Sequence, residues 1–215
     1  MSYASINGVT VVRGNVSIPA WGIWHADLWC DRAIPITSPA SLVIADLTAT
    51  CTVVRSVDWT GQRGVRVVGG YGGWRRAVTG QQYSNPAGLN ASTVISDTAT
   101  TVGEQVVIAT DRQIGTQWLR EAAAASDVLQ SIAPGAWWMG LDGVTHVGPR
   151  EAGAIVGVFT ATWVDQPGNV VRIATENPAE WLPGKTYASP QVQGTIDRVQ
   201  HWIDAGKFRT EVVNV

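Results

Sequence analysis

Histidine and carboxylate side chains stand close enough to act together at one place, in the aromatic run Trp21 to Cys30. His25 and Asp27 are two residues apart, a spacing that puts both on one face of a strand. Such a pair could bind a metal ion or orient a general base, but two ligands are not a metal site, and the spacing implies no third. The other histidines are His146 and His201. We therefore expect neither a metal site nor a cofactor.

The local signatures of hydrolytic enzymes are missing from the sequence. It contains no HExxH, no CxxC pair and no G-x-S-x-G, which removes the usual marks of zinc peptidases, zinc ribbons and serine hydrolases. Scattered Ser, His and Asp residues could still form a triad in space. Glu176 and Glu180 could serve as a glycosidase pair, but the neighbouring prolines and Trp181 indicate a turn with a solvated rim. We expect a protein that is not an enzyme.

Tryptophan is abundant and charge is sparse. The 215 residues include 11 tryptophans, 45% are hydrophobic and 15% are charged. This composition indicates a large core, or surfaces that are buried against other copies or partners. An alternative is that exposed tryptophans stack on sugar rings, with Trp21, Trp24, Trp74, Trp137 and Trp138 as the candidates.

The charge balance and the lengths of the apolar runs limit which kinds of partner the chain is expected to bind. The 15 Lys and Arg residues are offset by 17 Asp and Glu residues, so the sequence does not predict DNA binding by phosphate neutralisation. No apolar run approaches the roughly 20 residues needed to span a bilayer, and the N-terminus does not resemble a signal peptide. We expect a soluble chain with no membrane anchor. Cys30 and Cys51 lie in apolar strand-like runs, which favours buried free thiols over a disulfide.

Turn signals between β-branched runs predict strands at both ends of the chain. The last hairpin pairs residues 195–203 with 207–215 around Asp204-Ala205-Gly206. Two further hairpins are expected, with turns at 140–143 and 165–168. In the run 21–30, alternation makes the side with Trp24, Ala26, Leu28 and Cys30 the expected core face.

Two helices are expected in the middle of the chain. Residues 92–103 carry apolar side chains near one face, with Ser92 as the expected cap and Gly103 as the terminator. Residues 116–132 combine good helix formers with an apolar stripe, and Pro134-Gly135 follows them. The order of elements predicts a mainly β (α+β) fold with two small β-barrel or sandwich domains and a helical segment between them. The expected boundaries are 1–80, 81–135 and 136–215.

Three stretches resemble the baseplate hub proteins of long-tailed bacteriophages, including the family of the late-control tail protein. They are WGIWHADLW at 21–29 after an opening hairpin, WWMGLDGVTHVGPR at 137–150 after a helix, and RVQHWIDAGKFRTEV at 198–212. The resemblance implies tube-related β-barrel domains in a homotrimer, whose two barrels per chain form a pseudo-sixfold ring. The ring would join the tail tube to the central spike at the tail tip of the virion, with the distal tail protein as a further neighbour.

The resemblance gives the tryptophans and their neighbours a role in assembly. The candidates for contacts between subunits are Trp24, Trp29, Trp74, Trp137, Trp138, His201, Trp202 and Phe208. A mildly negative channel would let the genomic DNA pass without specific binding, and Asp27, Asp58 and Asp142 are candidates for its wall. The alternatives are a carbohydrate- or receptor-binding module of the tail, and a tail-associated cell-wall hydrolase that uses His25 or Glu180.

Overall fold

A six-stranded antiparallel barrel forms the first part of the structure. The computed structural model describes residues 3–150, 152–156, 159–175, 177–204 and 207–215. The barrel strands follow the order β1-β4-β5-β6-β3-β2, and β2 pairs with β1 to close the ring. Their bounds are β1 (Ala4–Ile6), β2 (Val9–Pro19), β3 (His25–Cys30), β4 (Ala40–Ile44), β5 (Leu47–Trp59) and β6 (Gln62–Gly69). Trp24, Ala26, Leu28 and Cys30 are all buried, which confirms the expected core face.

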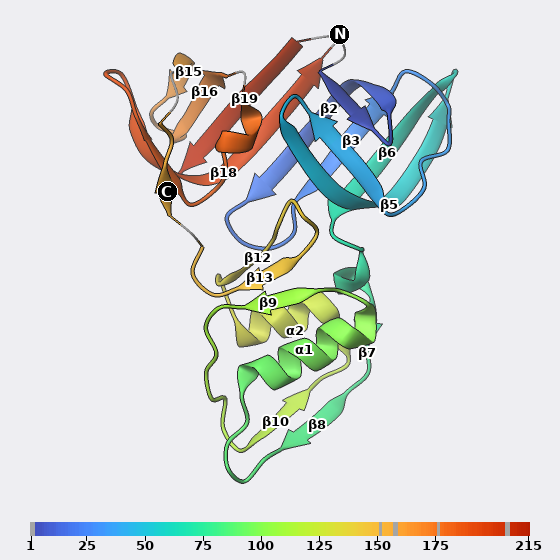
Figure 1. Cartoon of the computed structure of the whole chain (residues 1–215), viewed down its shortest axis with the longest axis vertical. Helices are drawn as coiled ribbons and strands as arrows, with labels where there is room; N and C mark the ends of the chain where they lie inside the picture. Colours follow the sequence, from blue (N-terminus) through green and yellow to red (C-terminus); the bar gives the residue numbers. More distant parts are fainter. Residues whose placement is uncertain (1–2, 151, 157–158, 176, 205–206) are drawn as a thin grey trace.

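The C-terminal strands extend the barrel's sheet beyond β2. β18 (Gln193–Asp204) pairs antiparallel with β2 and also with β19 (Lys207–Asn214), so the predicted closing hairpin is confirmed, while its residues 205–206 lie outside the described ones. The sheet continues through β16 (Val170–Ala174) and β15 (Thr160–Asp165), the predicted second hairpin. β17 (Lys185–Ala188) pairs with the start of β18 and with β14 (Gly153–Ala154). In Figure 1 these strands lie beside the barrel at the top of the view.

A separate core fills the inner side of this extension. Trp181 is 1% exposed and contacts Phe159 and Tyr187, with ring centroids 5.0 and 5.4 Å away. Val199 and Val212 of the closing hairpin pack in the same cluster. The short 3-10 helix η2 (Pro178–Glu180) precedes Trp181.

The middle of the chain forms a helical layer below the sheets (Figure 1). The helices α1 (Ala91–Val102) and α2 (Ala125–Ile132) pack against each other, and a 3-10 helix, η1 (Gly73–Arg75), contacts both. β9 (Val106–Ile108), β12 (Trp137–Met139) and β13 (Thr145–Val147) make a small sheet between the helices and the barrel. The predicted hairpin around 140–143 is therefore confirmed. The remaining strands are β7 (Ala77–Val78), β8 (Gln81–Ser84), β10 (Gln117–Arg120) and β11 (Ala123–Ala124).

The helix predicted at 116–132 was wrong over its first half. Residues Gln117–Arg120 form β10, which pairs with β8, and α2 begins only at Ala125. Helix propensity is a weak preference that tertiary contacts override. Here Arg120, 1% exposed, is held by Asp97 of α1 at 3.0 Å, and Trp118 packs against Tyr83 of β8. The apolar residues of the predicted stripe do not share one buried face, because Leu119 of β10 is 62% exposed, whereas Leu129 and Ile132 of α2 are buried.

The helix predicted at 92–103 is confirmed as α1, and Gly103 ends it with a positive φ of 76°. Its expected cap was wrong, because Asn90 rather than Ser92 occupies the N-cap position. Ser92 instead bonds through its hydroxyl and its N–H to the Asp111 carboxylate, at 2.6 and 3.0 Å.

The mainly β (α+β) fold is thus confirmed. The division at 80 and 135 stays a prediction, although β13 of the third expected segment pairs with β9 of the second. Cys30 and Cys51 are buried free thiols, as favoured by their apolar surroundings. No helix among the described residues is long and apolar enough to cross a bilayer.

Candidate functional site

Two surfaces of the structure contain aromatic and charged side chains that the sequence analysis identified as candidates. The first is the outer sheet face, which we define by the outward residues Arg172, Glu211, Arg209, Trp202, Asn15, Asp27, Trp29 and Arg66. Strand register places these side chains in rows. Trp202 of β18 lies opposite Asn15 of β2, Asn15 opposite Asp27 of β3, and Asp27 opposite Arg66 of β6.

Ion pairs and cation–π contacts compensate the charges of the outer sheet face. Arg172 donates to Glu211 Oε1 from both Nε and Nη2, at 3.0 and 2.8 Å, and the Trp202 indole N–H donates to Glu211 Oε2 at 3.1 Å. Arg209 lies over the Trp202 ring, 5.1 Å from its centroid. Arg66 pairs with Asp27 at 3.2 Å. The result is a surface on which cations, anions and indole rings alternate.

The eight assembly candidates divide by burial. Trp24, Trp74, Trp137 and His201 are between 0 and 4% exposed and pack inside the chain, whereas Trp29, Trp138, Trp202 and Phe208 keep part of their surface. Trp24, Trp74 and Trp137 therefore have no open ring face for a sugar to stack on. Trp21 and Trp138 meet edge to face at 66°, so they do not form a flat platform either. Contacts of the eight residues with other subunits stay a prediction.

His201 is a core residue at the junction of the barrel and the C-terminal sheet. Its Nδ1 is 3.0 Å from the Thr210 hydroxyl, its ring stacks on Phe208, and its Nε2 has no partner among the described residues. Complete burial lowers the pKa of His201 to about 3, because the charged ring would lose its hydration. The imidazole is therefore neutral at physiological pH.

The candidates for catalysis do not come together in the described part of the chain. His25 and Asp27 share the outer face of β3, but Asp27 pairs with Arg66, and burial, followed by Arg66, lowers the pKa of His25. The described residues contain no cluster of three or more His, Cys, Asp or Glu that could hold a metal ion. Glu180 is half-buried in η2, and Glu176 lies outside the described residues.

The acidic candidates for a channel wall have different surroundings. Asp27 pairs with Arg66, and Asp58 pairs with Arg63 at 2.7 Å. Asp142 lies in the β12–β13 turn, where its Oδ1 accepts the Val144 N–H at 2.9 Å. Asp27 and Asp58 thus present compensated rather than free negative charge.

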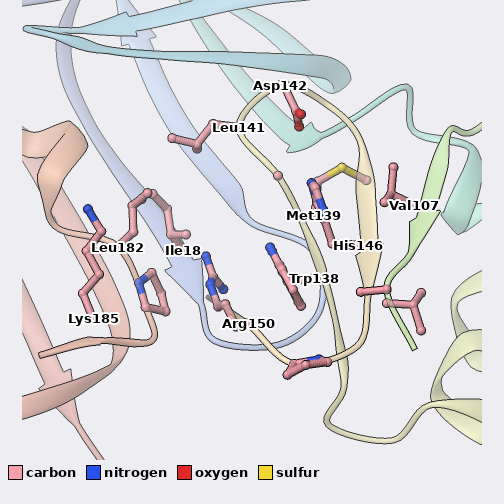
Figure 2. A pocket seen from close by; sticks show the side chains of 15 residues that line it. Ile18, Val107, Trp138, Met139, Leu141, Asp142, His146, Arg150, Leu182 and Lys185 are labelled. Atoms are coloured by element: carbon pink, nitrogen blue, oxygen red, sulfur yellow. The ribbon is translucent and has the colours of Figure 1, made fainter. Parts of the chain in front are cut away.

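The second surface is a cavity of about 510 Å³ where three parts of the chain meet (Figure 2). We call it the Arg150 pocket. Its walls come from the end of β2, from the small sheet β9-β13-β12 with the chain that follows it, and from the segment before β17. Its lining residues are Ile18, Val107, Ala109, Trp138, Met139, Gly140, Leu141, Asp142, His146, Val147, Pro149, Arg150, Leu182, Pro183 and Lys185.

A stack of planar groups organises the Arg150 pocket. Trp138 lies parallel to His146, its cross-strand neighbour, with centroids 5.2 Å apart. Arg150 places its guanidinium carbon 5.3 Å from the Trp138 ring centroid. Its Nη1 donates to the carbonyl oxygens of Pro19 and Ala20 at 3.2 and 2.8 Å. Burial lowers the pKa of Arg150 to about 10, which still leaves it cationic at neutral pH.

Sequence reasoning missed the roles of Arg150 and Arg120. The turn at 140–143 was a sufficient signal for placing Trp138 opposite His146. Nothing in the sequence indicated that Arg150 reaches Pro19, which is 131 positions away. Arg120 was assigned to a helix, so its burial against α1 was not foreseen.

The sequence matches no protein-family model. It also matches no curated protein. Solved structures share the fold. The c3393 protein of E. coli, a component of the type VI secretion system described as similar to the T4 bacteriophage tail proteins gp27 and gp5, gives a TM-score of 0.70 at 10% identity. That match covers 99% of this chain and 76% of the other.

Two tail proteins match over almost their whole length. The 43 kDa tail protein of prophage MuSo2 from Shewanella oneidensis gives a TM-score of 0.63 at 7% identity, covering 99% of this chain and 97% of the other. The tail protein from Neisseria meningitidis MC58 gives 0.64 at 11% identity, covering 97% and 94%. At these identities the likeness establishes a shared fold.

Proposed function

We propose that this chain is a structural protein of a bacteriophage tail. The observation that carries the proposal is that the fold matches the Shewanella and Neisseria tail proteins end to end, over 94% or more of both partners in each match. A fold shared over the whole chain supports a shared role more strongly than one shared barrel would, because small β-barrels serve many functions.

The more specific proposal is a baseplate hub or tail-tip ring that joins the tail tube to the central spike. In this ring the chain is a homotrimer, and each copy contributes its barrel and its C-terminal sheet to a pseudo-sixfold wall. The pairing of β2 with β18 supports the arrangement, because it fixes the two units in one continuous sheet. The resemblance of the three sequence stretches to hub proteins supports it independently.

A free sheet edge supports assembly with other chains. Within the described residues β15 pairs only with β16, and its other edge is unpaired. Trp163 and Val164 on this strand are 46 and 39% exposed. An edge strand with exposed apolar side chains is a template for pairing with another chain, and proteins that stay monomeric usually protect such edges.

The outer sheet face is the proposed wall of the DNA channel. Arg66 pairs with Asp27, while Arg172 and Arg209 share Glu211, so a passing duplex would meet one net positive charge instead of a free basic patch. Weak phosphate neutralisation favours sliding without specific binding. A purely structural role, with no catalytic activity and no cofactor, is part of the proposal.

Locating the chain in assembled particles tests this function. A peptide tag at the C-terminus, detected by gold-labelled antibody in electron micrographs, is expected to mark the tail tip. Matched particles without the tag control for non-specific label. Label on the capsid, or particles that form normally without the chain, would contradict a structural role in the tail.

A further inference from the structure

The charge of Arg150 has no counter-ion in the part of the chain that the structure describes. No carboxylate pairs with it there, and none pairs with Lys185 on the neighbouring wall. Both hydrogen bonds that Arg150 makes to the described residues use Nη1, so within that part of the chain the hydrogens of Nε and Nη2 are free. Nε and Nη2 of Arg150 are not fully buried, so a ligand in the pocket can reach them.

The surroundings of Arg150 favour a bound anion. The guanidinium lies against the Trp138 ring and is shielded enough for its pKa to fall to about 10. A partly desolvated cation without a counter-ion is costly, and a carboxylate that accepts two parallel N–H bonds from a guanidinium offsets that cost. Lys185, the first residue of β17, adds a second positive charge to the lining.

Most of the other residues that line the Arg150 pocket are apolar. Ile18, Leu141 and Leu182 line it together with the buried Pro183. A ligand that fills this cavity must therefore carry an apolar group beside its anionic group. Figure 2 shows Lys185 at the left of the view, Arg150 near the centre and Asp142 at the top.

Asp142 limits the charge of the ligand. Asp142 belongs to the lining of the pocket. Its Oδ1 accepts the Val144 N–H, a bond that does not neutralise the negative charge of the carboxylate. A dianion such as phosphate would be repelled more than a single carboxylate. The pocket is thus suited to one negative charge near Arg150 and to apolar atoms elsewhere.

The rim of the pocket is apolar as well. Val107 is 53% exposed, and Trp21, which packs edge-on against Trp138 at 6.0 Å, is 40% exposed. A small carboxylic acid would leave both uncovered. A protein segment that inserts one acidic residue could cover them with its flanking side chains.

We propose that the Arg150 pocket is a docking site for a protein segment from a neighbouring chain that presents one Asp or Glu next to an apolar side chain. The acidic group binds the free edge of Arg150 near Lys185, and the apolar side chain lies between Leu141 and Leu182. This inference does not depend on the proposed tail function, because any partner with such a segment would satisfy it.

A peptide selection on the full chain tests the proposal. Random dodecapeptides displayed on yeast are selected against the native protein, and enriched peptides are then measured by titration. The expected result is enrichment of peptides that pair an acidic with an apolar residue. Arg150→Gln is expected to weaken their binding about tenfold or more, and Lys185→Gln several-fold. Arg75→Gln, an exposed arginine outside the pocket, is the matched control and should leave binding unchanged.

The alternatives have distinct outcomes. Lys185→Gln removes no ion pair or hydrogen bond among the described residues, so it remains informative if Arg150→Gln fails to fold. The proposal would be overturned if no peptides are enriched or if the enriched peptides lack acidic residues. It would also be overturned if both variants bind the peptides as tightly as the native chain does. Sodium hexanoate is titrated in parallel. If it alone binds, saturably and through Arg150, the ligand is a small carboxylic acid and the protein-segment proposal fails.

Discussion

At the scale of single residues, Arg120 shows how a buried charge is accommodated. Its guanidinium donates to Asp97 Oδ2 at 3.0 Å, to the Thr98 hydroxyl at 3.1 Å and to Gln81 Oε1 at 2.8 Å, while Nε donates to the Thr79 carbonyl at 3.2 Å. These acceptors come from α1, from β8 and from the chain just before β8. Arg120 therefore joins the β8–β10 strand pair to α1.

Substitution of Arg120 should be among the most destabilising changes in the chain. Arg120→Met leaves three neutral acceptors without this donor, and Asp97 keeps only the Tyr83 hydroxyl as a donor. Because Asp97 is 40% exposed and can be solvated, we expect a cost of about 3 kcal/mol, at the low end for breaking a buried pair. We expect the free energy of unfolding, measured by urea titration with circular dichroism, to fall by that amount. Arg75→Met, at an exposed arginine, should change it by less than about 0.5 kcal/mol. Equal effects of the two substitutions would contradict this role of Arg120.

His201 makes stability depend on pH with a definite sign. Its folded pKa of about 3 lies below the value of 6.5 of a free histidine. Between these values the unfolded chain binds a proton that the folded chain does not, so acidification favours unfolding. The stabilising contribution is present above the unfolded pKa and is lost as the pH falls toward the folded one.

This sign gives a measurable difference between the native chain and His201→Leu. Urea titrations at pH 7 and pH 4.5 should show the native chain losing on the order of 2 kcal/mol more than the variant, at about 1.4 kcal/mol per pH unit. If His201→Leu keeps the full pH dependence of the native chain, another group is responsible and the neutral buried imidazole is not the cause.

At the scale of elements, Glu104 ties the glycine-rich segment 70–73 to the end of α1. Its carboxylate accepts the N–H of Gly73 at 2.5 Å and of Tyr71 at 3.4 Å. Burial raises the pKa of Glu104, and the backbone donors Gly73 and Tyr71 act against that rise. The connection between the barrel and η1 therefore depends on one buried carboxyl group.

Removing this group should loosen the connection locally. Glu104→Ala leaves the two backbone donors without an acceptor, at a cost of about 1–3 kcal/mol each where they are buried. Hydrogen exchange followed by mass spectrometry should show faster exchange in peptides that contain residues 70–74. Gln105→Ala, at the adjacent exposed position, is the control and should leave that exchange unchanged. Unaltered protection in Glu104→Ala would rule out the tether.

Sequence patterns predicted the hairpins well and the second helix poorly, for physical reasons. A hairpin is specified locally, since the turns at 140–143 and 165–168 bring adjacent strands together. The segment from Gln117 to Ala124 has helix-forming residues, but its pairing with β7 and β8 and the burial of Arg120 depend on residues about 40 positions away. Such contacts do not appear in local periodicity.

At the scale of the whole molecule, the Arg150 pocket and the outer sheet face also depend on contacts between distant parts of the chain, which local sequence patterns do not reveal. The alternation along 21–30 gave the core face of β3, and the expected turn gave the Trp138–His146 pair. The Arg150 pocket requires β2, β13 and the segment before β17 to converge, and the outer sheet face requires the register between β2 and β18. Both are products of topology, which a single sequence without a structure leaves open.

The free edge of β15 yields a prediction about assembly. Val164→Lys places a charge on the edge that we propose pairs with another chain, and charged edges oppose such pairing. The variant should fold normally but form fewer oligomers in analytical ultracentrifugation. Val156→Lys, at a valine that is 93% exposed and outside the strands, is the matched control. If both variants assemble like the native chain, β15 does not lie in a subunit interface.

The mass of the assembled particle tests the central claim most directly. Native mass spectrometry over a range of concentrations, alone and with the proteins encoded beside it, should give a species of three copies of the 22.9 kDa chain. A chain that stays at the mass of one copy in every mixture and at every concentration would contradict a ring-forming tail protein.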